Sequence, residues 1–105
     1  MKTIITAMVL VVGMSASGWA AAAGDAAAGQ KVFNKVCKMC HATGMMGAPK
    51  LGSSKDWDPR VKQGEDTLVQ HAIHGYKKMP AKGHCRTCSD QEIANAVAYM
   101  LSKLK

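Results

Sequence analysis

The chain has 105 residues, with 14 Lys and Arg against 7 Asp and Glu, so its formal net charge is +7. This length sets one domain as the upper limit. A basic chain is attracted to acidic surfaces. However, no aromatic-plus-basic stacking pattern is present and the beginning of the chain indicates export, so we expect no nucleic-acid partner.

Residues 1–23 are typical of a secretory signal peptide. Lys2 supplies a positive charge, residues 4–12 are nearly all apolar, and small residues follow. We expect cleavage between about residues 20 and 24, which leaves a mature domain over 24–105 in the periplasm. The alternative is an uncleaved membrane anchor, but the apolar run is well short of the ~20 residues that a spanning helix needs. We therefore expect no stable membrane insertion after cleavage.

A mature domain of about 80 residues buries a modest core and usually needs a disulfide, a metal or a large cofactor. Its four aromatic residues are few for a self-sufficient core, and they are Phe33, Trp57, Tyr76 and Tyr99. A buried, flat, apolar cofactor would make up the shortfall. Export would also place the cysteines in an oxidising compartment.

The first predicted helix covers residues 26–42, because Phe33, Val36, Cys37 and Cys40 follow one face of a 3.6-residue period. Residues 43–54 are rich in Gly, Ser and Pro and predict a loop.

After this loop, Asp58 and Pro59 predict an N-cap and first helical residue of a short turn that stops at Gly64. Residues 65–74 predict a further helix, with acidic residues in its first turn and Gly75 as its stop.

Residues 76–88 predict a second long loop, and the last helix follows it. Ser89 and Glu92 form a capping-box pair at the start of this helix. Behind them runs one apolar stripe: Ile93, Ala96, Val97, Met100, Leu101 and Leu104. No strand pattern is present, so the fold class is all-α, with three principal helices, a short one and long loops.

Cys37, Cys40 and His41 form the sequence C-x-x-C-H within the first predicted helix. At positions i, i+3 and i+4 their side chains lie on one side of that helix. Two thioether bonds can then anchor one edge of a porphyrin while the histidine reaches the iron, and C-x-x-C-H is the attachment pattern of haem c for this reason. We therefore expect one covalently bound haem c.

Two other kinds of site compete with haem for these cysteines. Cys37 and Cys40 could join Cys85 and Cys88 in a four-cysteine zinc site, but such sites usually lie on turns, and the first pair lies in a helical pattern. A thioredoxin-like dithiol would need a strand before it. The second pair is followed by Ser89 rather than His, so a second haem would lack its ligand. A structural disulfide is favoured for this pair, and the alternatives are a redox-active pair and two free thiols.

A second axial ligand to the iron is needed opposite His41. By position Met79 is the best candidate, because it lies in the loop after the helix predicted over residues 65–74 and Pro80 stiffens that loop. Ligation by His71 or His74 is the alternative, although both are interpreted as surface residues. The other sulfur and imidazole groups considered were Met39, Met45, Met46, Met100 and His84.

The order C-K-M-C-H, then G-A-P-K-L at residues 47–51, then M-P-A-K-G at residues 79–83, resembles a class I cytochrome c. More narrowly the sequence resembles the cytochrome c5 group, through Trp57, Pro59, Arg60 and Gly64 and through the extra cysteine pair. The resemblance implies a small cytochrome c fold wrapped around a covalently bound haem.

The same resemblance assigns roles to particular residues. It implies thioether bonds at Cys37 and Cys40, and axial ligation of the iron by His41 and Met79. The Pro49 carbonyl would accept the Nδ1 proton of His41, and Trp57 and Arg60 would lie in the cofactor site. It further implies that Cys85 and Cys88 form a disulfide, and that Gly29 and Phe33 meet Tyr99 where the first and last helices cross.

With both axial positions filled, we expect an electron carrier rather than an enzyme. It would run between respiratory-chain donors, such as a quinol-oxidising complex or a membrane-anchored cytochrome, and a terminal oxidase or peroxidase. The alternative is a haem-based gas-binding or sensing module in which Met79 is labile. Partners would dock through acidic surfaces, and the protein would be a monomer or a weak homodimer. The lysines expected near the haem edge are Lys38, Lys50, Lys77, Lys78 and Lys82.

Overall fold

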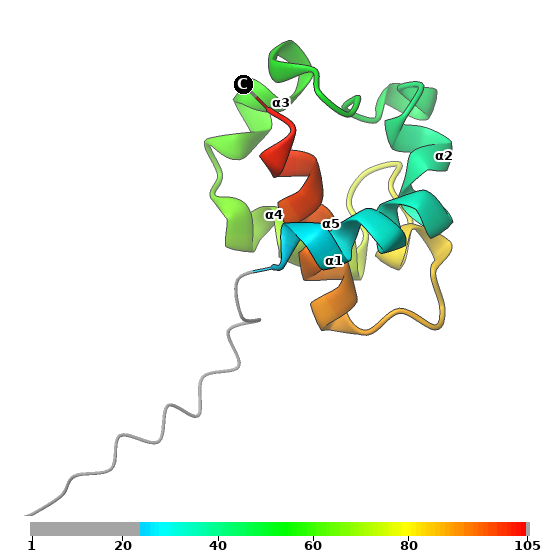
Figure 1. Cartoon of the computed structure of the whole chain (residues 1–105). Coiled ribbons are helices and arrows are strands. Elements are labelled where there is room, and N and C mark those ends of the chain that lie inside the picture. Colours follow the sequence, from blue (N-terminus) through cyan, green and yellow to red (C-terminus); the bar gives the residue numbers. More distant parts are fainter. Residues whose placement is uncertain (1–23, 105) are drawn as a thin grey trace, which may run out of the picture.

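The computed structural model describes residues 24–104, so the predicted signal peptide lies outside the described residues. Five α-helices occur within this range: α1 (Ala26–Val32), α2 (Lys38–His41), α3 (Ser54–Val61), α4 (Glu65–His74) and α5 (Asp90–Ser102). Residues 24–104 contain no strand, and one isolated bridge joins Tyr76 to Met79. The all-α prediction is confirmed (Figure 1).

The first predicted helix is confirmed, but it is not uniform. The Asp25 carboxylate caps α1 by accepting hydrogen bonds from the amides of Ala27 and Ala28. A π-helical turn, Phe33–Cys37, then joins α1 to α2 without a break in the helical path. Such turns are rare inside α-helices and are frequent at functional sites. Here the π turn leads directly into the C-x-x-C-H segment.

The predicted start of the short helix at Asp58 and Pro59 is wrong. Helix α3 begins five residues earlier, where the Ser53 hydroxyl accepts a hydrogen bond from the amide of Asp56 at 3.3 Å. Pro59 therefore lies inside the helix, where its missing N–H removes one backbone hydrogen bond. The capping serine at the earlier position decides where this helix starts.

Helices α4 and α5 begin and end close to their predicted limits. The positive φ of 89° at Gly75 ends α4, as expected of a glycine stop. The capping box of α5 is confirmed, because Ser89 accepts from the Glu92 amide at 3.1 Å and Glu92 accepts from the Ser89 amide at 3.0 Å.

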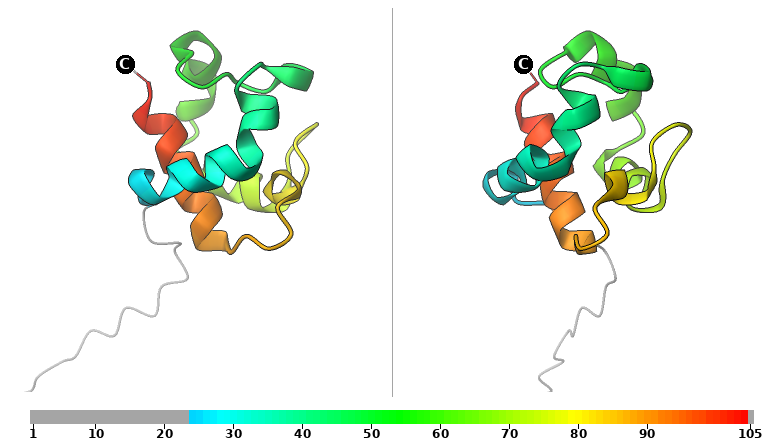
Figure 2. Two further views of the ribbon diagram at one scale, coloured as in Figure 1. Left: turned by 45° about the vertical axis from the view of Figure 1, so that its right-hand side comes forward. Right: turned by 90° about the vertical axis from the view of Figure 1, so that its right-hand side faces the viewer.

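Helix α1 crosses α5 at the centre of the fold, as Figures 1 and 2 both show. A Cβ atom on Gly29 would lie 1.8 Å from the backbone oxygen of Asn95, so only glycine fits this crossing. Beside it the rings of Phe33 and Tyr99 pack with centroids 5.3 Å apart. The crossing implied by the family resemblance is therefore present.

The core lies between α1, α4 and α5 and extends to Trp57 on α3. Most of the predicted α5 stripe is buried, whereas Leu101 and Leu104 are half-buried. Within residues 24–104, none of the helices is both long enough and apolar enough to cross a membrane. The loop after α4 projects outward from this core (Figure 2).

Candidate functional site

His41 is the last residue of α2 and is the one buried polar residue of the described core, with 8% of its surface exposed. Its Nδ1 lies 2.8 Å from the Pro49 carbonyl oxygen. The Leu51 amide also donates to the His41 carbonyl at 2.7 Å, so the loop after α2 folds back over the end of this helix. Because a carbonyl can only accept, Nδ1 carries the proton and Nε2 keeps a free lone pair.

The surroundings of His41 also keep its ring neutral. Burial lowers the pKa of the imidazole below its ordinary value of 6.5, and the positive charge of Arg60 lowers it further. The hydrogen bond to Pro49 opposes these effects only in part. A neutral imidazole with an unprotonated Nε2 is the form that binds a metal.

Helix α3 supports this loop through Trp57 and places Arg60 near the imidazole. The Trp57 indole donates to the Lys50 carbonyl at 2.9 Å, and its ring stacks with that of His41 at a centroid distance of 6.1 Å. The Arg60 guanidinium donates to the Asp56 carbonyl at 2.6 Å. The structure thus brings Pro49, Trp57 and Arg60 together around one imidazole.

Cys37 and Cys40 are half-buried and unpaired. Burial raises the pKa of the Cys37 thiol from 9.0 to about 11, whereas redox-active thiols usually have a lowered pKa. The other two cysteines, Cys85 and Cys88, are joined in a disulfide and are buried. A four-cysteine zinc site is thereby excluded, and residues 24–104 hold no cluster of three His, Cys, Asp or Glu side chains suited to a metal ion.

Met79 is half-buried and packs against the core, as Cys37 does. The 3₁₀ turn that follows it, Ala81–His84, contacts both α4 and the π turn that ends at Cys37. The fold therefore brings the Met79 loop beside the helix that carries the free cysteines.

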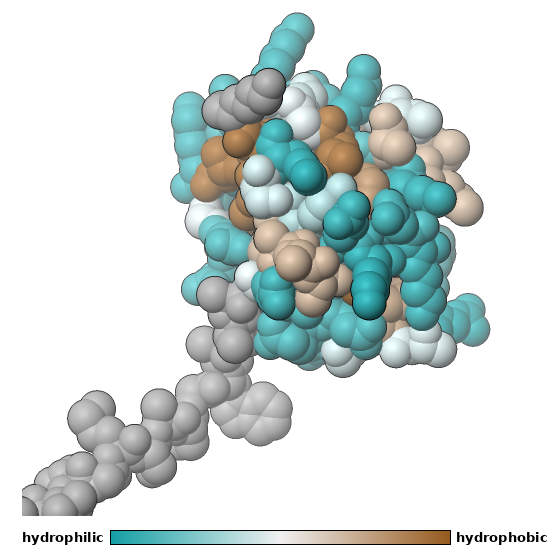
Figure 3. Space-filling model, viewed as in Figure 1, coloured by the Kyte–Doolittle hydropathy of each residue, from teal (hydrophilic) through white to brown (hydrophobic). Residues whose placement is uncertain are grey.

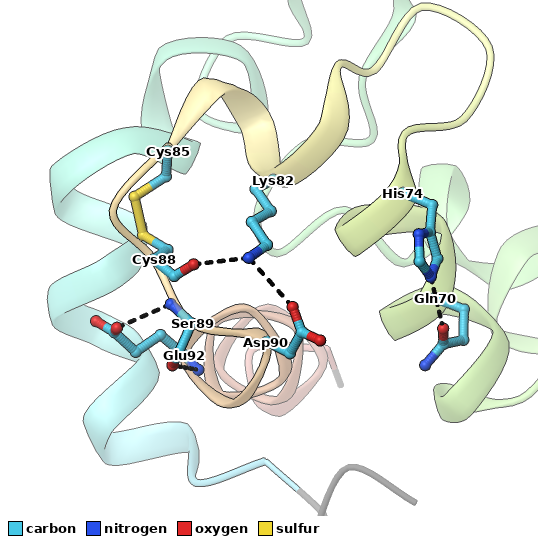
Figure 4. Close-up of polar contacts among 8 residues, drawn as sticks. All are labelled: Gln70, His74, Lys82, Cys85, Cys88, Ser89, Asp90 and Glu92. Carbon is cyan, nitrogen blue, oxygen red and sulfur yellow. Dashed lines mark hydrogen bonds and ion pairs between the residues drawn. A yellow bond between two sulfur atoms is a disulfide. The ribbon is translucent and has the colours of Figure 1, made fainter. Parts of the chain in front are cut away.

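The histidines considered as alternative ligands have other partners. The His71 ring stacks on that of Tyr76, with centroids 3.8 Å apart and planes within 2°. The His74 ring shares a hydrogen bond of 3.1 Å with the side chain of Gln70 (Figure 4). His74 is exposed, as expected; His84 is exposed as well, and Met100 is buried in the core.

Two features were not foreseen from the sequence. The Lys82 ammonium, expected as a docking charge, donates to the Cys88 carbonyl at 2.8 Å and pairs with Asp90 at 3.1 Å (Figure 4). No local pattern marks such a contact, because it depends on how the loop folds onto α5. The stack of Tyr76 on His71 spans five residues and matches no helical spacing, so it too gives no sequence signal.

The donor set fits a covalently attached haem. Two unpaired thiols precede a buried, neutral imidazole whose free nitrogen is held in place by the carbonyl behind it. A methionine thioether lies in the loop beside the same helix. These groups are the ones that attach and ligate haem c.

Comparison with known proteins agrees with this reading. A sequence profile of the family described as cytochrome c oxidase, cbb3-type, subunit III matches residues 24–100. Cytochrome c-555 of Chlorobaculum tepidum is 49% identical over 85 residues, which cover 77% of this chain and 79% of that protein. Cytochrome c5 of Azotobacter vinelandii is 42% identical over 79 residues, which cover 73% of this chain and 95% of that protein.

Solved structures show the same fold. A chain in the crystal structure of an electron transfer complex of nitrite reductase with cytochrome c is 37% identical and superposes with a TM-score of 0.68. The match covers 72% of this chain and 93% of the other. With this donor set and these relatives, the chain belongs to the class I cytochromes c, as a small monohaem member similar to cytochromes c5 and c-555, and it carries one covalently bound haem c.

Proposed function

We propose that this protein is a periplasmic carrier of single electrons. Cys37 and Cys40 form the thioether bonds, and His41 and Met79 are the axial ligands. The observation that carries the proposal is the placement of His41, which is buried and oriented by the Pro49 carbonyl at 2.8 Å. A ligand fixed in this way needs little rearrangement when the charge beside it changes, and this favours rapid electron transfer over catalysis.

The chain's own residues set the conditions of this transfer. The bound haem supplies an iron that changes oxidation state by one electron. Pro49 and Trp57 hold the plane of the His41 ring through the hydrogen bond and the stack described above. The Met79 sulfur would bind the iron as its second protein ligand, leave no position open to substrate and favour the reduced state. The apolar residues of α4 and α5 would exclude water from the cofactor site, and this exclusion also favours the reduced state.

Partners are proposed to be redox proteins with acidic docking surfaces. Lys31, Lys35 and Lys38 are exposed along the segment from α1 to α2, where hydrophilic side chains gather (Figure 3). Lys50, Lys77 and Lys78 are exposed as well. A relative found in complex with nitrite reductase supports an acceptor protein of this kind. Donors would be a quinol-oxidising complex or a membrane-anchored cytochrome, and acceptors an oxidase or a peroxidase.

The deciding experiment is an absorption spectrum of protein matured in a periplasm, recorded in the oxidised and in the reduced state. We expect a sharp reduced α-band and a weak near-infrared band from the methionine–iron bond in the oxidised state. Met79→Ala should abolish the near-infrared band, whereas Met39→Ala should preserve it, because Met39 is 72% exposed.

Three results would count against the proposal. Haem without the near-infrared band in the unaltered protein would favour ligation by two histidines or an open site. Carbon monoxide binding by the reduced, unaltered protein would favour the gas-sensing alternative. Material without haem would reject the proposal altogether.

A further inference from the structure

The segment that carries Met79 has an unusual backbone. Lys77, Lys82 and His84 have φ values of 53°, 54° and 68°, a left-handed region that non-glycine residues rarely adopt. Within residues 24–104 the one other non-glycine residue of this kind is Met46. Residues in this conformation persist only where surrounding contacts hold them. The Met79 segment must therefore be held by contacts outside itself.

The first of these contacts lies before Met79. The Tyr76 amide donates to the Met79 carbonyl at 3.0 Å, and the Met79 amide donates to the Tyr76 carbonyl at 2.9 Å. The Tyr76 ring is stacked on His71 of α4, as described above, and the Lys77 ammonium lies 5.3 Å from the centre of the Tyr76 ring. Because the backbone of Met79 is bonded to that of Tyr76, the stack on α4 fixes both residues.

The second contact lies after Met79 and is made by Lys82. Its ammonium donates to the Cys88 carbonyl and pairs with the Asp90 carboxylate at the start of α5 (Figure 4). The Lys82 carbonyl accepts from the Cys85 amide at 2.9 Å, and the disulfide then joins Cys85 to Cys88. The Lys82 side chain is 28% exposed but that of Asp90 is 65% exposed, so water screens the ion pair, and the hydrogen bond to the Cys88 carbonyl is the firmer of the two contacts.

From this arrangement we infer that Tyr76 and Lys82 are positioning residues for the Met79 sulfur. They hold the two ends of the segment, Tyr76 on α4 and Lys82 on α5, so that Met79 stays at the iron. This inference rests on the proposed ligation by Met79. It implies that removing either contact raises the fraction of molecules in which the sulfur has left, without changing the ligand itself.

Imidazole tests this directly, because it binds the oxidised protein only when the methionine has left. Lys82→Met removes the ammonium and keeps an unbranched side chain of similar length. We expect it to raise the apparent imidazole affinity by about tenfold, as expected for loss of hydrogen bonds to a charged group. Tyr76→Leu should raise the affinity by about fivefold, because it removes an aromatic pair. Loss of the near-infrared band during titration reports the binding.

Three matched variants separate positioning from charge and from bulk. Lys78→Met removes the same charge from an exposed lysine of the same loop, without the contacts of Lys82, and should leave the imidazole affinity unchanged. Lys82→Arg keeps the positive charge, so its imidazole affinity should stay close to that of the unaltered protein. Tyr76→Phe should keep the stack and therefore also the unaltered affinity. Hydrogen exchange gives a readout independent of added ligand: the Tyr76 and Met79 amides should exchange faster in Lys82→Met and Tyr76→Leu.

Each outcome is decisive. The role of Lys82 is overturned if Lys82→Met, Lys78→Met and the unaltered protein have equal imidazole affinities and equal exchange rates. The role of Tyr76 is overturned if Tyr76→Leu, Tyr76→Phe and the unaltered protein are equal in both measurements. If the unaltered protein lacks the near-infrared band, the proposed ligation itself fails, and this inference fails with it.

Discussion

At His41 three neighbours act on one imidazole ring. The Pro49 carbonyl holds the Nδ1 proton, the Trp57 ring stacks alongside, and Arg60 adds a positive charge that lowers the pKa of the ring. Arg60 and Trp57 lie one turn apart on α3, and Pro49 lies in the preceding loop. The ring is therefore oriented by a loop that α3 itself holds in place.

The contribution of Trp57 can be measured with Trp57→Phe. Phenylalanine keeps most of the aromatic surface but loses the indole hydrogen bond to the Lys50 carbonyl. We expect the free energy of unfolding to fall by about 1 kcal/mol, the usual cost of one hydrogen bond. Urea denaturation of the oxidised protein would measure this change, with Lys62→Ala at an exposed position of the same region as control. A change no larger than that of the control would contradict the structural role of the indole.

The helices depend on a few residues at their crossings and ends. The crossing of α1 with α5 requires Gly29, and the start of α5 requires Ser89 and Glu92. These residues carry no chemistry of the haem site. They decide whether the first and last helices meet, and thus whether the core closes over the cofactor.

Gly29→Ala separates two effects that have opposite signs. Helix propensity alone would stabilise α1 by about 1 kcal/mol. The clash with the Asn95 carbonyl should instead destabilise the protein by about 1–3 kcal/mol, because that neighbour is backbone and cannot turn aside. Thermal or urea unfolding would show the sign, with Gln30→Ala on the exposed side of α1 as the matched substitution. Stabilisation by Gly29→Ala would show that the helices do not approach this closely.

The capping box of α5 predicts a pH dependence. Glu92 has its pKa lowered below 4.5, chiefly because its carboxylate accepts a hydrogen bond from the Ser89 amide and also interacts with the Ser89 hydroxyl. A carboxyl group whose pKa is lowered by folding stabilises the protein above its unfolded pKa. That stabilisation is lost as the pH falls through the folded value.

Urea denaturation of the unaltered protein and of Glu92→Gln, compared between pH 7 and pH 3, would measure this effect. The difference in unfolding free energy between the two should shrink below about pH 4.5. A difference that stays constant over this range would contradict the prediction. Ser89→Ala should cost about 1 kcal/mol at pH 7, as other lost N-caps do.

Over the whole molecule, the positive charge should govern encounters with other molecules. An anionic one-electron oxidant such as ferricyanide should react more slowly as ionic strength rises, because salt screens the attraction. Lys38→Glu, next to Cys37, should lower the rate at low salt more than Lys103→Glu, at the end of α5 away from α2 (Figures 1 and 2). Stopped-flow kinetics would measure both. Equal effects of the two variants would show that electrons do not leave near α2.

The sequence allowed much of the fold to be predicted, because the relevant signals are local. The C-x-x-C-H spacing, the α5 capping box and the Gly75 stop each involve residues within a few positions of one another. The start of α3 was missed because Pro59 is an N-terminal signal that a stronger cap at Ser53 overrides.

Other features could not be read from one sequence, for a physical reason. The π turn that ends at Cys37 has no known spacing rule to reveal it. The contacts of Lys82 and Tyr76 depend on how a long loop lies on two helices, and their partners are set only once those helices have packed. The support of the Met79 segment was therefore invisible until the fold was known.

The crossing of α1 with α5 also bears on the order in which the protein is made. The Asp25 amide donates to the Asn95 side chain at 2.8 Å, so this contact joins residues 70 positions apart. Because synthesis starts at the N-terminus, Cys37, Cys40 and His41 are made well before α5. Until then α1 has no partner, and a helix of 7 residues is not stable alone. The cysteines thus lie in an open peptide until α5 is available, and the packing of α5 on α1 is what closes the domain.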